Sequence, residues 1–203
     1  MTLAEAARRL KPRRHGNRSL PNLLLVTDEA RLPDPLPTVA RLPAGSGVLL
    51  RHYGAADRAP LAHALARRAR RRRLTLLVAA DWRLAAAVGA AGIHLPEGLL
   101  RSGLLATLLG WARRRRRLVT AACHGPAALA LAHRLGVSAA LLSPVFATAS
   151  HAGAAGLGPL RFARWCRRAA LPVFALGGLS GRTARRLAGS GAAGLAALDA
   201  LKD

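Results

Sequence analysis

Short apolar runs alternate with helix-length segments along almost the whole chain after residue 22, and this alternation limits the fold more than any other feature. Each run is too short for a helix and ends in turn residues, as buried strands do. Eight such runs occur, at residues 23–27, 48–51, 74–79, 92–95, 118–122, 139–142, 172–176 and 194–197.

The segments between these runs show apolar spacing near 3.6 residues, as helices do, wherever they are long enough to judge. They span residues 61–72, 82–88, 104–116, 126–135, 160–169 and 182–187. The first connection, residues 31–43, carries four prolines and is expected to be mostly loop. Eight strand-then-helix units predict an α/β fold, a single compact (β/α)8 TIM barrel. An open doubly wound sheet uses similar units with fewer strands and is the alternative.

Length and composition favour one domain, which spans residues 21–203. With 52% hydrophobic but only 3% aromatic residues, its core must consist of Leu, Ala and Val. Residues 1–20 are basic and lack the apolar region of a signal peptide, so we expect a mobile basic N-terminal arm or a short helix. No apolar run is long enough to cross a bilayer, and Cys123 and Cys166 suit neither a disulfide framework nor a metal site. A cytoplasmic location without membrane contact is expected.

The formal charge of +23 comes almost entirely from arginine, because lysine occurs only at Lys11 and Lys202. Taken alone, this charge suggests nucleic acid or a membrane surface as a partner. The arginines, however, gather within residues 67–73, 113–117 and 164–168, at the ends of helical segments, where cations complement the helix C-terminus. Aromatic residues that could stack on bases are not interleaved with these arginines. We therefore interpret the arginine clusters as solvated helix ends rather than as a nucleic-acid-binding surface.

The sequence Pro-Val-Phe-Ala-Leu-Gly-Gly-Leu-Ser-Gly-Arg, residues 172–182, is a candidate ligand-binding turn. A buried strand leads through Gly177 and Gly178 to Ser180 and a helix. Adjacent glycines let backbone N–H groups face a ligand, and a helix N-terminus behind them favours an anion, here a phosphate. A tight strand-to-helix turn without a ligand is the alternative.

In a parallel barrel the residues that follow the strands carry the chemistry. Arg51 follows the second strand and is a candidate for binding an anion, and His124 follows the fifth and is a candidate proton donor and acceptor. A surface arginine and a structural histidine are the alternatives. Asp81 suits the N-cap of the next helix and His94 a hydrogen-bonded barrel position, so this pair indicates no metal site.

A long loop rich in Gly and Ala follows the sixth strand and continues to Gly158. Within it, Thr148, Ser150 and His151 can donate hydrogen bonds to phosphate oxygens, and the glycines allow closure over a ligand. A loop of this length in an otherwise tightly connected chain is typical of a functional segment.

Four segments carry a resemblance in their order and spacing: Val-Thr-Asp at 26–28, Ala-Val-Gly-Ala-Ala-Gly-Ile-His-Leu at 87–95, Ser-Pro-Val-Phe-Ala-Thr at 143–148 and Ala-Leu-Gly-Gly-Leu at 175–179. Together they resemble the thiamine-phosphate synthase and thiazole tautomerase (TenI) family over residues 23–198. The resemblance implies a (β/α)8 barrel that binds a small phosphorylated thiazole. By motif, Thr148 and Ser150 match the family's hydroxyl pair, His151 replaces its lysine, and Gly177 and Gly178 match its phosphate turn.

The synthase residues of the family are mostly replaced. Its Gln-Leu-Arg-Glu-Lys reads Leu-Leu-Arg-His-Tyr at 49–53, which keeps only Arg51. Its magnesium and pyrophosphate positions carry apolar residues here: Ala79 and Ala80 for its Asn-Asp, Leu99 near its second aspartate, and Ala122 for its strand-five serine. Pyrimidine transfer from a diphosphate needs those contacts. Asp81 is one position off and would serve as a metal ligand only if the turn shifts.

Resemblance to the tautomerase branch of the family implies a reaction that needs fewer of these residues. Its substrate is a carboxylated, phosphorylated thiazole that becomes aromatic through a proton shift, and His124 stands where that branch carries its acid/base histidine. No metal is needed for such a step. We therefore expect a TenI-like tautomerase without a cofactor. A Mg²⁺-dependent synthase and a catalytically inactive phosphate-ligand-binding or regulatory protein are the alternatives, and the sequence leaves open whether the chain forms a homo-oligomer.

Overall fold

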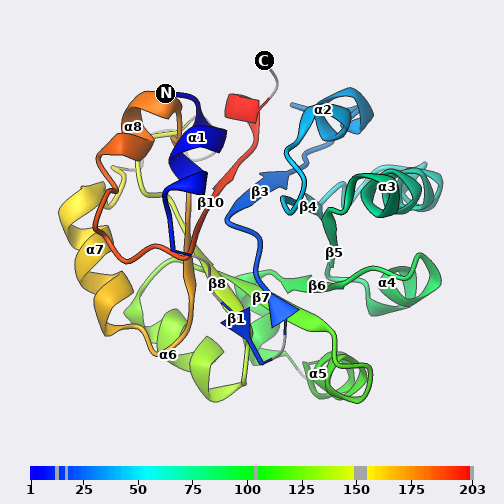
Figure 1. Ribbon diagram of the computed structural model, residues 1–203. Coiled ribbons are helices and arrows are strands. Elements are labelled where there is room, and N and C mark those ends of the chain that lie inside the picture. The colour runs from blue at the N-terminus through cyan, green and yellow to red at the C-terminus, as the bar shows by residue number, and fades with distance from the viewer. Residues whose placement is uncertain (12–13, 17, 103–104, 149–154, 202–203) are drawn as a thin grey trace.

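Eight parallel strands close into a barrel in which each strand pairs with two neighbours (Figure 1). The computed structural model describes residues 1–203 apart from 12–13, 17, 103–104, 149–154 and 202–203. The barrel strands are β3 (Leu23–Val26), β4 (Gly47–Leu50), β5 (Thr75–Ala79), β6 (Gly92–Leu95), β7 (Leu118–Cys123), β8 (Ala139–Leu142), β9 (Val173–Leu176) and β10 (Gly194–Ala197). Because β10 pairs with β3, the predicted (β/α)8 barrel is confirmed and the open sheet is wrong.

The helices surround the barrel and connect successive strands (Figure 1). They are α2 (Leu36–Arg41), α3 (Arg58–Arg72), α4 (Trp82–Ala87), α5 (Leu105–Arg114), α6 (Pro126–Arg134), α7 (Gly158–Arg168) and α8 (Gly181–Arg185), with 3-10 turns η1 (Glu97–Arg101) and η3 (Asp199–Leu201). The proline-rich connection contains only the short α2, which begins directly after Pro35. In the described part of the chain, no helix is both long and apolar enough to cross a membrane.

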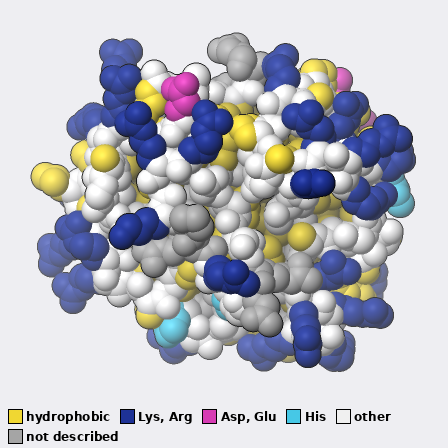
Figure 2. Space-filling view, viewed as in Figure 1, with side chains coloured by type: hydrophobic (Ala, Val, Ile, Leu, Met, Phe, Trp, Pro, Cys, Tyr) yellow, Lys and Arg dark blue, Asp and Glu magenta, His cyan; other side chains and the backbone are white. Residues whose placement is uncertain are grey.

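The arginine clusters lie where helices end. The last turns of α3, α5 and α7 carry Arg70, Arg71 and Arg72, then Arg113 and Arg114, then Arg167 and Arg168. At these positions they face the negative end of the helix dipole. In the view of Figure 2, Lys and Arg side chains form groups both at the edge and across the face of the molecule.

The barrel interior is filled by side chains from alternate positions of the strands, because successive strand residues point to opposite faces. Leu24, Leu49, Leu77 and Phe174 belong to this inner cluster. A Cβ at Gly194 would overlap the Phe174 ring, so glycine on β10 makes room for the largest inner side chain. The other positions pack beneath the helices in a second cluster.

The first twenty residues add a helix and a hairpin to the barrel. In α1 (Leu3–Arg8) the N-cap residue Thr2 forms a capping box with Glu5, and Leu3 and Ala7 are buried. The helix packs beside α8 and β10, as Figure 1 shows. β1 (Arg14–His15) and β2 (Arg18–Ser19) pair in an antiparallel hairpin. Of the two forms expected from the sequence, an arm or a short helix, the structure has the helix over residues 3–8.

Candidate functional site

A hollow of about 120 Å³ opens at the carboxyl ends of the barrel strands. Its wall includes Arg31, Arg51, Ser143, Thr148, Gly177 and Gly178. Four residues singled out in the sequence, which come from the ends of β4, β8 and β9, therefore lie around one space. Ser150 and His151, predicted to join them, lie outside the described residues.

The turn after β9 is built from backbone because there is no room for side chains. Gly177 and Gly178 have φ angles of 95° and 63°, in the left-handed region that favours glycine. A Cβ at Gly178 would overlap the carbonyl oxygen of Ala147, and one at Gly177 would lie 3.0 Å from the Cα of Pro144. The loop after β8 thus packs directly on the glycine turn, and the Phe146 N–H donates to the Gly177 oxygen at 3.1 Å.

Side chains of Ser180 and Thr183 close the start of α8. The Ser180 hydroxyl accepts the Thr183 N–H at 3.2 Å, and the Thr183 hydroxyl accepts the Ser180 N–H at 2.8 Å, which is a capping box. Thr183 Oγ1 also lies 3.0 Å from the Gly178 oxygen, to which it can donate. Since these two N–H groups of α8 are already bonded, the glycine turn itself is the candidate anion site.

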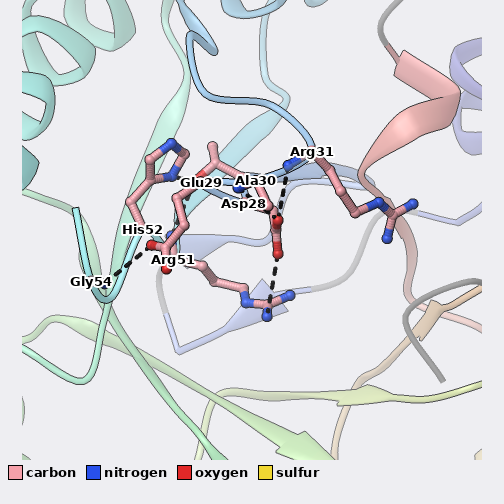
Figure 3. Close-up of polar contacts among 8 residues, drawn as sticks. Asp28, Glu29, Ala30, Arg31, Arg51, His52 and Gly54 are labelled. Atoms are coloured by element: carbon pink, nitrogen blue, oxygen red, sulfur yellow. Dashed lines mark hydrogen bonds and ion pairs between the residues drawn. The ribbon is translucent and has the colours of Figure 1, made fainter.

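Arg51 is held at the mouth by the residues that follow β3 (Figure 3). Its Nη2 lies 3.8 Å from Oδ2 of Asp28, and the other oxygen of Asp28 accepts the N–H groups of Ala30 and Arg31. Its backbone N–H donates to the Thr27 hydroxyl at 3.1 Å. The ion pair is longer than a charge-assisted hydrogen bond, so the guanidinium is oriented by charge and keeps donor capacity for a closer acceptor.

His52 points to the opposite face, as strand alternation predicts. It is buried, with Nδ1 2.8 Å from the Thr27 hydroxyl and Nε2 3.3 Å from the Pro33 oxygen. Since a carbonyl oxygen only accepts, Nε2 carries the proton and Nδ1 accepts from Thr27. His52 therefore joins two connections of the barrel and is structural.

The ring of Tyr53 has two guanidinium groups near it. The Cζ atoms of Arg51 and Arg58 are 6.0 and 5.8 Å from its ring centroid, within the range of cation–π contacts. Arg58 also donates to the backbone oxygen of Ala79 at the end of β5 and lies 3.6 Å from Asp81. The first residue of α3 is thereby fixed across the ends of β4 and β5.

His124 follows β7 and is anchored on two sides. Its Nδ1 lies 2.9 Å from the backbone oxygen of Ser143, and its backbone N–H donates to Glu97 at 2.7 Å. Because the carbonyl oxygen accepts, Nδ1 carries the proton, and Nε2 is the basic nitrogen of the neutral ring. Ser143 is itself a wall residue of the hollow, whereas His124 is not among the wall residues and is joined to them through Ser143.

A second histidine lies deeper, inside the barrel. His94 is buried, and its Nδ1 is 2.9 Å from the Thr120 hydroxyl, so the predicted hydrogen-bonded barrel histidine is confirmed. Burial, with a smaller effect from the positive charge of Arg51, lowers the pKa of His94 to about 3. The ring is therefore neutral at neutral pH. The two thiols are also inert, because burial raises the pKa values of Cys123 and Cys166 to about 12.

The carboxylates beside the strand ends are already engaged within the chain. Each accepts backbone N–H groups: Asp28 those of Ala30 and Arg31, Glu29 that of Gly54, Asp81 that of Leu84, and Glu97 that of His124. The bond to Asp81 confirms it as the N-cap of α4. Among the described residues, no group of three or more His, Cys, Asp and Glu is arranged to hold a metal ion.

Sequence reasoning missed Arg31, Ser143 and Arg58 as residues of the mouth. The two arginines have no local signal that distinguishes them from the many others in the chain. Ser143 could have been found, because it follows β8 as His124 follows β7 and Cys123 pairs with Leu142. Adjacent strands in register bring the residues that follow them together.

A cavity larger than this hollow lies elsewhere in the described structure. It has a volume of about 560 Å³ and lies between α6 and α7, with Leu129, Trp165 and Arg168 in its wall. None of the residues predicted from the sequence to act in the site lines it. The smaller hollow at the strand ends therefore remains the candidate site, in agreement with the place where such barrels carry their chemistry.

Fold and site together define a single-domain (β/α)8 barrel with a backbone turn suited to an anion in the wall of its hollow, and a histidine bonded to another residue of that wall. Comparison with known proteins identifies the family. The family model described as thiamine monophosphate synthase matches residues 23–201, and the chain belongs to this family. The resemblance found in the sequence is thus confirmed.

The chain is also similar to individual proteins, one in sequence and others in fold. A protein of Geobacter sulfurreducens, provisionally named a thiamine-phosphate synthase, is 33% identical over 119 residues, which are 58% of this chain and 54% of that protein. The match therefore spans about half of the relative's length. A thiamine phosphate pyrophosphorylase from Pyrococcus furiosus has the same fold, with a TM-score of 0.72 at 20% identity over 88% of this chain and 85% of that one. FabK from Thermotoga maritima is a more distant likeness, with a TM-score of 0.67 at 13% identity over 90% of this chain and 59% of that one.

Proposed function

We propose that this protein is a cytoplasmic TenI-like tautomerase that shifts a proton on a carboxylated, phosphorylated thiazole without a metal or cofactor. The observation that carries the proposal is the setting of His124. Its Nδ1 is bound to the Ser143 oxygen at 2.9 Å, which makes Nε2 the basic nitrogen, and Ser143 lines the hollow. A histidine poised in this way can accept and return a proton near neutral pH.

In this proposal the phosphate of the substrate lies on the Gly177–Gly178 turn. Backbone N–H groups bind phosphate without a side chain, and the crowding around both glycines gives a physical reason for their presence. The Thr148 hydroxyl, in the same wall, donates a further hydrogen bond. Ser150 and His151 are proposed to add to this end of the site, as the family resemblance implies.

The reaction needs one group to take a proton from the thiazole ring and to return a proton at another ring atom, so that the ring becomes aromatic. His124 is proposed for both steps. Its backbone bond to Glu97 and its ring bond to Ser143 fix the imidazole, which favours transfer without rearrangement.

A second candidate is the synthase reaction, in which a pyrimidine diphosphate is joined to the thiazole phosphate. It is favoured by the description of the matching family and by the names of two relatives. Against it stand the alanines at 79, 80 and 122 and the engaged carboxylates beside the strand ends. We therefore place the tautomerase first.

Nucleic acid is not proposed as a partner. Three groups of arginines occupy the last turns of α3, α5 and α7, where they complement the helix dipoles. A continuous basic surface would be needed to follow a phosphate backbone.

One experiment separates these functions. The protein is incubated with the carboxylated thiazole phosphate tautomer alone, and in parallel with thiazole phosphate and the pyrimidine diphosphate, each with Mg²⁺ and with EDTA, and the products are identified by mass spectrometry and NMR. Aromatic thiazole at equal rates with Mg²⁺ and EDTA is the expected result. Mg²⁺-dependent thiamine phosphate would establish the synthase instead, and binding without conversion would establish an inactive ligand-binding protein.

A further inference from the structure

A further cavity lies at the opposite end of the barrel from the hollow. It has a volume of about 510 Å³ and lies where β7 begins, between the end of α5 and the hairpin of β1 and β2 (Figure 1). Its wall includes Leu118, the first residue of β7, and Ser138, which directly precedes β8. The cavity is therefore at the amino ends of the strands, and the proposed proton shift does not use it.

Basic side chains gather at this cavity. Arg113, Arg116 and Arg117 line it, together with His15 of β1, and none of the described wall residues is Asp or Glu. The sequence strengthens this imbalance, because none of the nine Asp and Glu residues of the chain lies between residues 98 and 198. Like charges held around one space repel each other, so the arrangement favours an anion from outside the chain.

The turn that ends α5 brings these arginines to the cavity. Arg116 has a φ angle of 49°, in the left-handed region, where the end of a helix usually carries glycine. Its N–H donates to the Arg113 oxygen at 3.1 Å, and the Arg117 N–H donates to the Ala112 oxygen at 2.7 Å. The chain thus turns back over the last turn of α5, and Arg116 and Arg117 join Arg113 in the same wall.

Hydrogen-bond donors in this wall lack acceptors. The Nε of Arg117 is buried and has no hydrogen-bond partner among the described residues, although buried donors are almost always bonded in native proteins. Arg113 donates to the Leu135 oxygen at 3.1 Å and keeps further N–H groups. The Ser138 hydroxyl accepts the Val119 N–H at 3.1 Å, and no acceptor for its own O–H is found in the described part of the chain. These groups can donate to a ligand.

We infer that this cavity binds a small oligophosphate, an anion with two or more linked phosphate groups, through Arg113, Arg116 and Arg117. Several guanidinium groups around one space match an anion that carries several negative charges, because their N–H donors pair with phosphate oxygens. The described wall contains no Phe, Trp or Tyr on which bases could stack, which favours a compact anion over a nucleic-acid strand. The inference does not depend on the proposed function, whose site is at the other end of the barrel.

Calorimetry with inorganic triphosphate in metal-free buffer of near-physiological ionic strength tests the site. Arg117→Gln should weaken the binding of triphosphate at least about ten-fold, as expected for lost hydrogen bonds between charged groups. Arg114→Gln is the matched control, because Arg114 belongs to the same run of arginines but lies beside Gly110 and is not in the wall. It should stay within about two-fold of the wild type, since exposed charges are screened by salt.

A second pair of variants does not depend on how well Arg117→Gln folds. Arg116 and Arg73 both follow a helix in the left-handed conformation, with φ angles of 49° and 54°, so glycine suits either position. Arg116→Gly and Arg73→Gly each remove one positive charge, but only Arg116 lines the cavity. Arg116→Gly should weaken triphosphate binding roughly five-fold, and Arg73→Gly should leave it unchanged.

Two further titrations define the ligand and its place. Inorganic phosphate should bind the wild type at least about ten-fold more weakly than triphosphate, because it engages fewer of the arginines. Gly178→Ala changes the glycine turn at the other end of the barrel and should keep the triphosphate affinity of the wild type.

Several results would overturn the inference. They are an absence of triphosphate binding, equal losses within either pair of arginine variants, and loss of binding in Gly178→Ala with retention in Arg117→Gln, which would place the anion in the hollow. Inorganic phosphate that binds as tightly as triphosphate would exclude an oligophosphate site. A single-stranded RNA that displaces triphosphate at lower concentration would identify a nucleic-acid surface instead. The proposed tautomerase is unaffected by any of these results.

Discussion

The Nδ1 atom of His124 and the backbone oxygen of Ser143 are 2.9 Å apart, across the ends of two adjacent barrel strands. This contact assigns the ring proton to Nδ1 and turns Nε2 into the basic nitrogen. The sequence alone does not indicate how the His124 ring is oriented. The backbone after the neighbouring strand sets this orientation. The wall of the hollow and the candidate base are fixed by the same residue.

His124→Ala should abolish tautomerisation and leave the affinity for thiazole phosphate nearly unchanged. Loss of a positioned proton-transfer group costs on the order of a hundred- to ten-thousand-fold in rate, whereas the phosphate contacts lie on another strand. Turnover measured by NMR and affinity measured by calorimetry test both parts. His133→Ala, on the exposed side of α6, is the control and should keep full activity. Undiminished turnover in His124→Ala would remove this residue from the mechanism.

Gly178→Ala should weaken the binding of thiazole phosphate at least about ten-fold, because the added Cβ would meet the Ala147 oxygen and displace the turn. Gly189→Ala is matched to it, since Gly189 also has a positive φ, 69°, but has open space around its Cβ position. Both variants carry backbone strain of about 1–2 kcal/mol and should melt at lower temperature. Only Gly178→Ala should lose affinity, and equal affinities for the two variants would contradict the phosphate turn.

Acid should destabilise the protein through His94. Because burial lowers the pKa of His94 to about 3, the folded state resists protonation that the unfolded state accepts near its ordinary value of 6.5. The contribution to stability is complete above pH 6.5 and is lost progressively as the pH falls toward 3. Urea denaturation at a series of pH values should show this slope, and His94→Gln should flatten it. An unchanged slope in the variant would assign the acid sensitivity to other groups.

Ala80→Gly should stabilise the protein by about 0.5–1 kcal/mol. Ala80 has a φ of 58°, which crowds its Cβ, so removal of that atom relieves more strain than the freedom gained by the unfolded chain costs. Ala130→Gly, inside α6, should instead destabilise by about 0.5–1 kcal/mol, because no strain is relieved there. Free energies of unfolding from urea titrations provide the comparison, and a destabilised Ala80→Gly would show that the turn is not strained.

The barrel could be predicted because its strands are buried on both faces. The runs at 92–95, 139–142 and 194–197 coincide with β6, β8 and β10, since a short and mostly apolar run bounded by turn residues leaves little choice of ends. The glycine turn and His124 could be selected because each directly follows a strand. Both features depend only on residues that are neighbours in the sequence, so the sequence alone reveals them.

The contacts of Arg58 could not be predicted in the same way. Arg58 is separated from Ala79 and Asp81 by the whole of α3, and only the return of the chain through β5 brings these two residues back to the first residue of that helix. The burial of α1 against α8 is also a contact between distant parts of the chain. Such contacts depend on the packing of finished elements, which composition and periodicity do not specify.

Because β10 pairs with β3, the barrel is closed, and the order of its strands along the chain can be changed by circular permutation. A closed barrel has no edge strand, so every strand keeps both pairing partners whichever strand comes first in the sequence. Joining the two present ends by a flexible linker and opening the polypeptide at the arginine-rich junction between α5 and β7 would leave every strand with its two neighbours. A circular permutant of this kind would begin at β7 and would carry His124, Ser143 and the glycine turn in its first half.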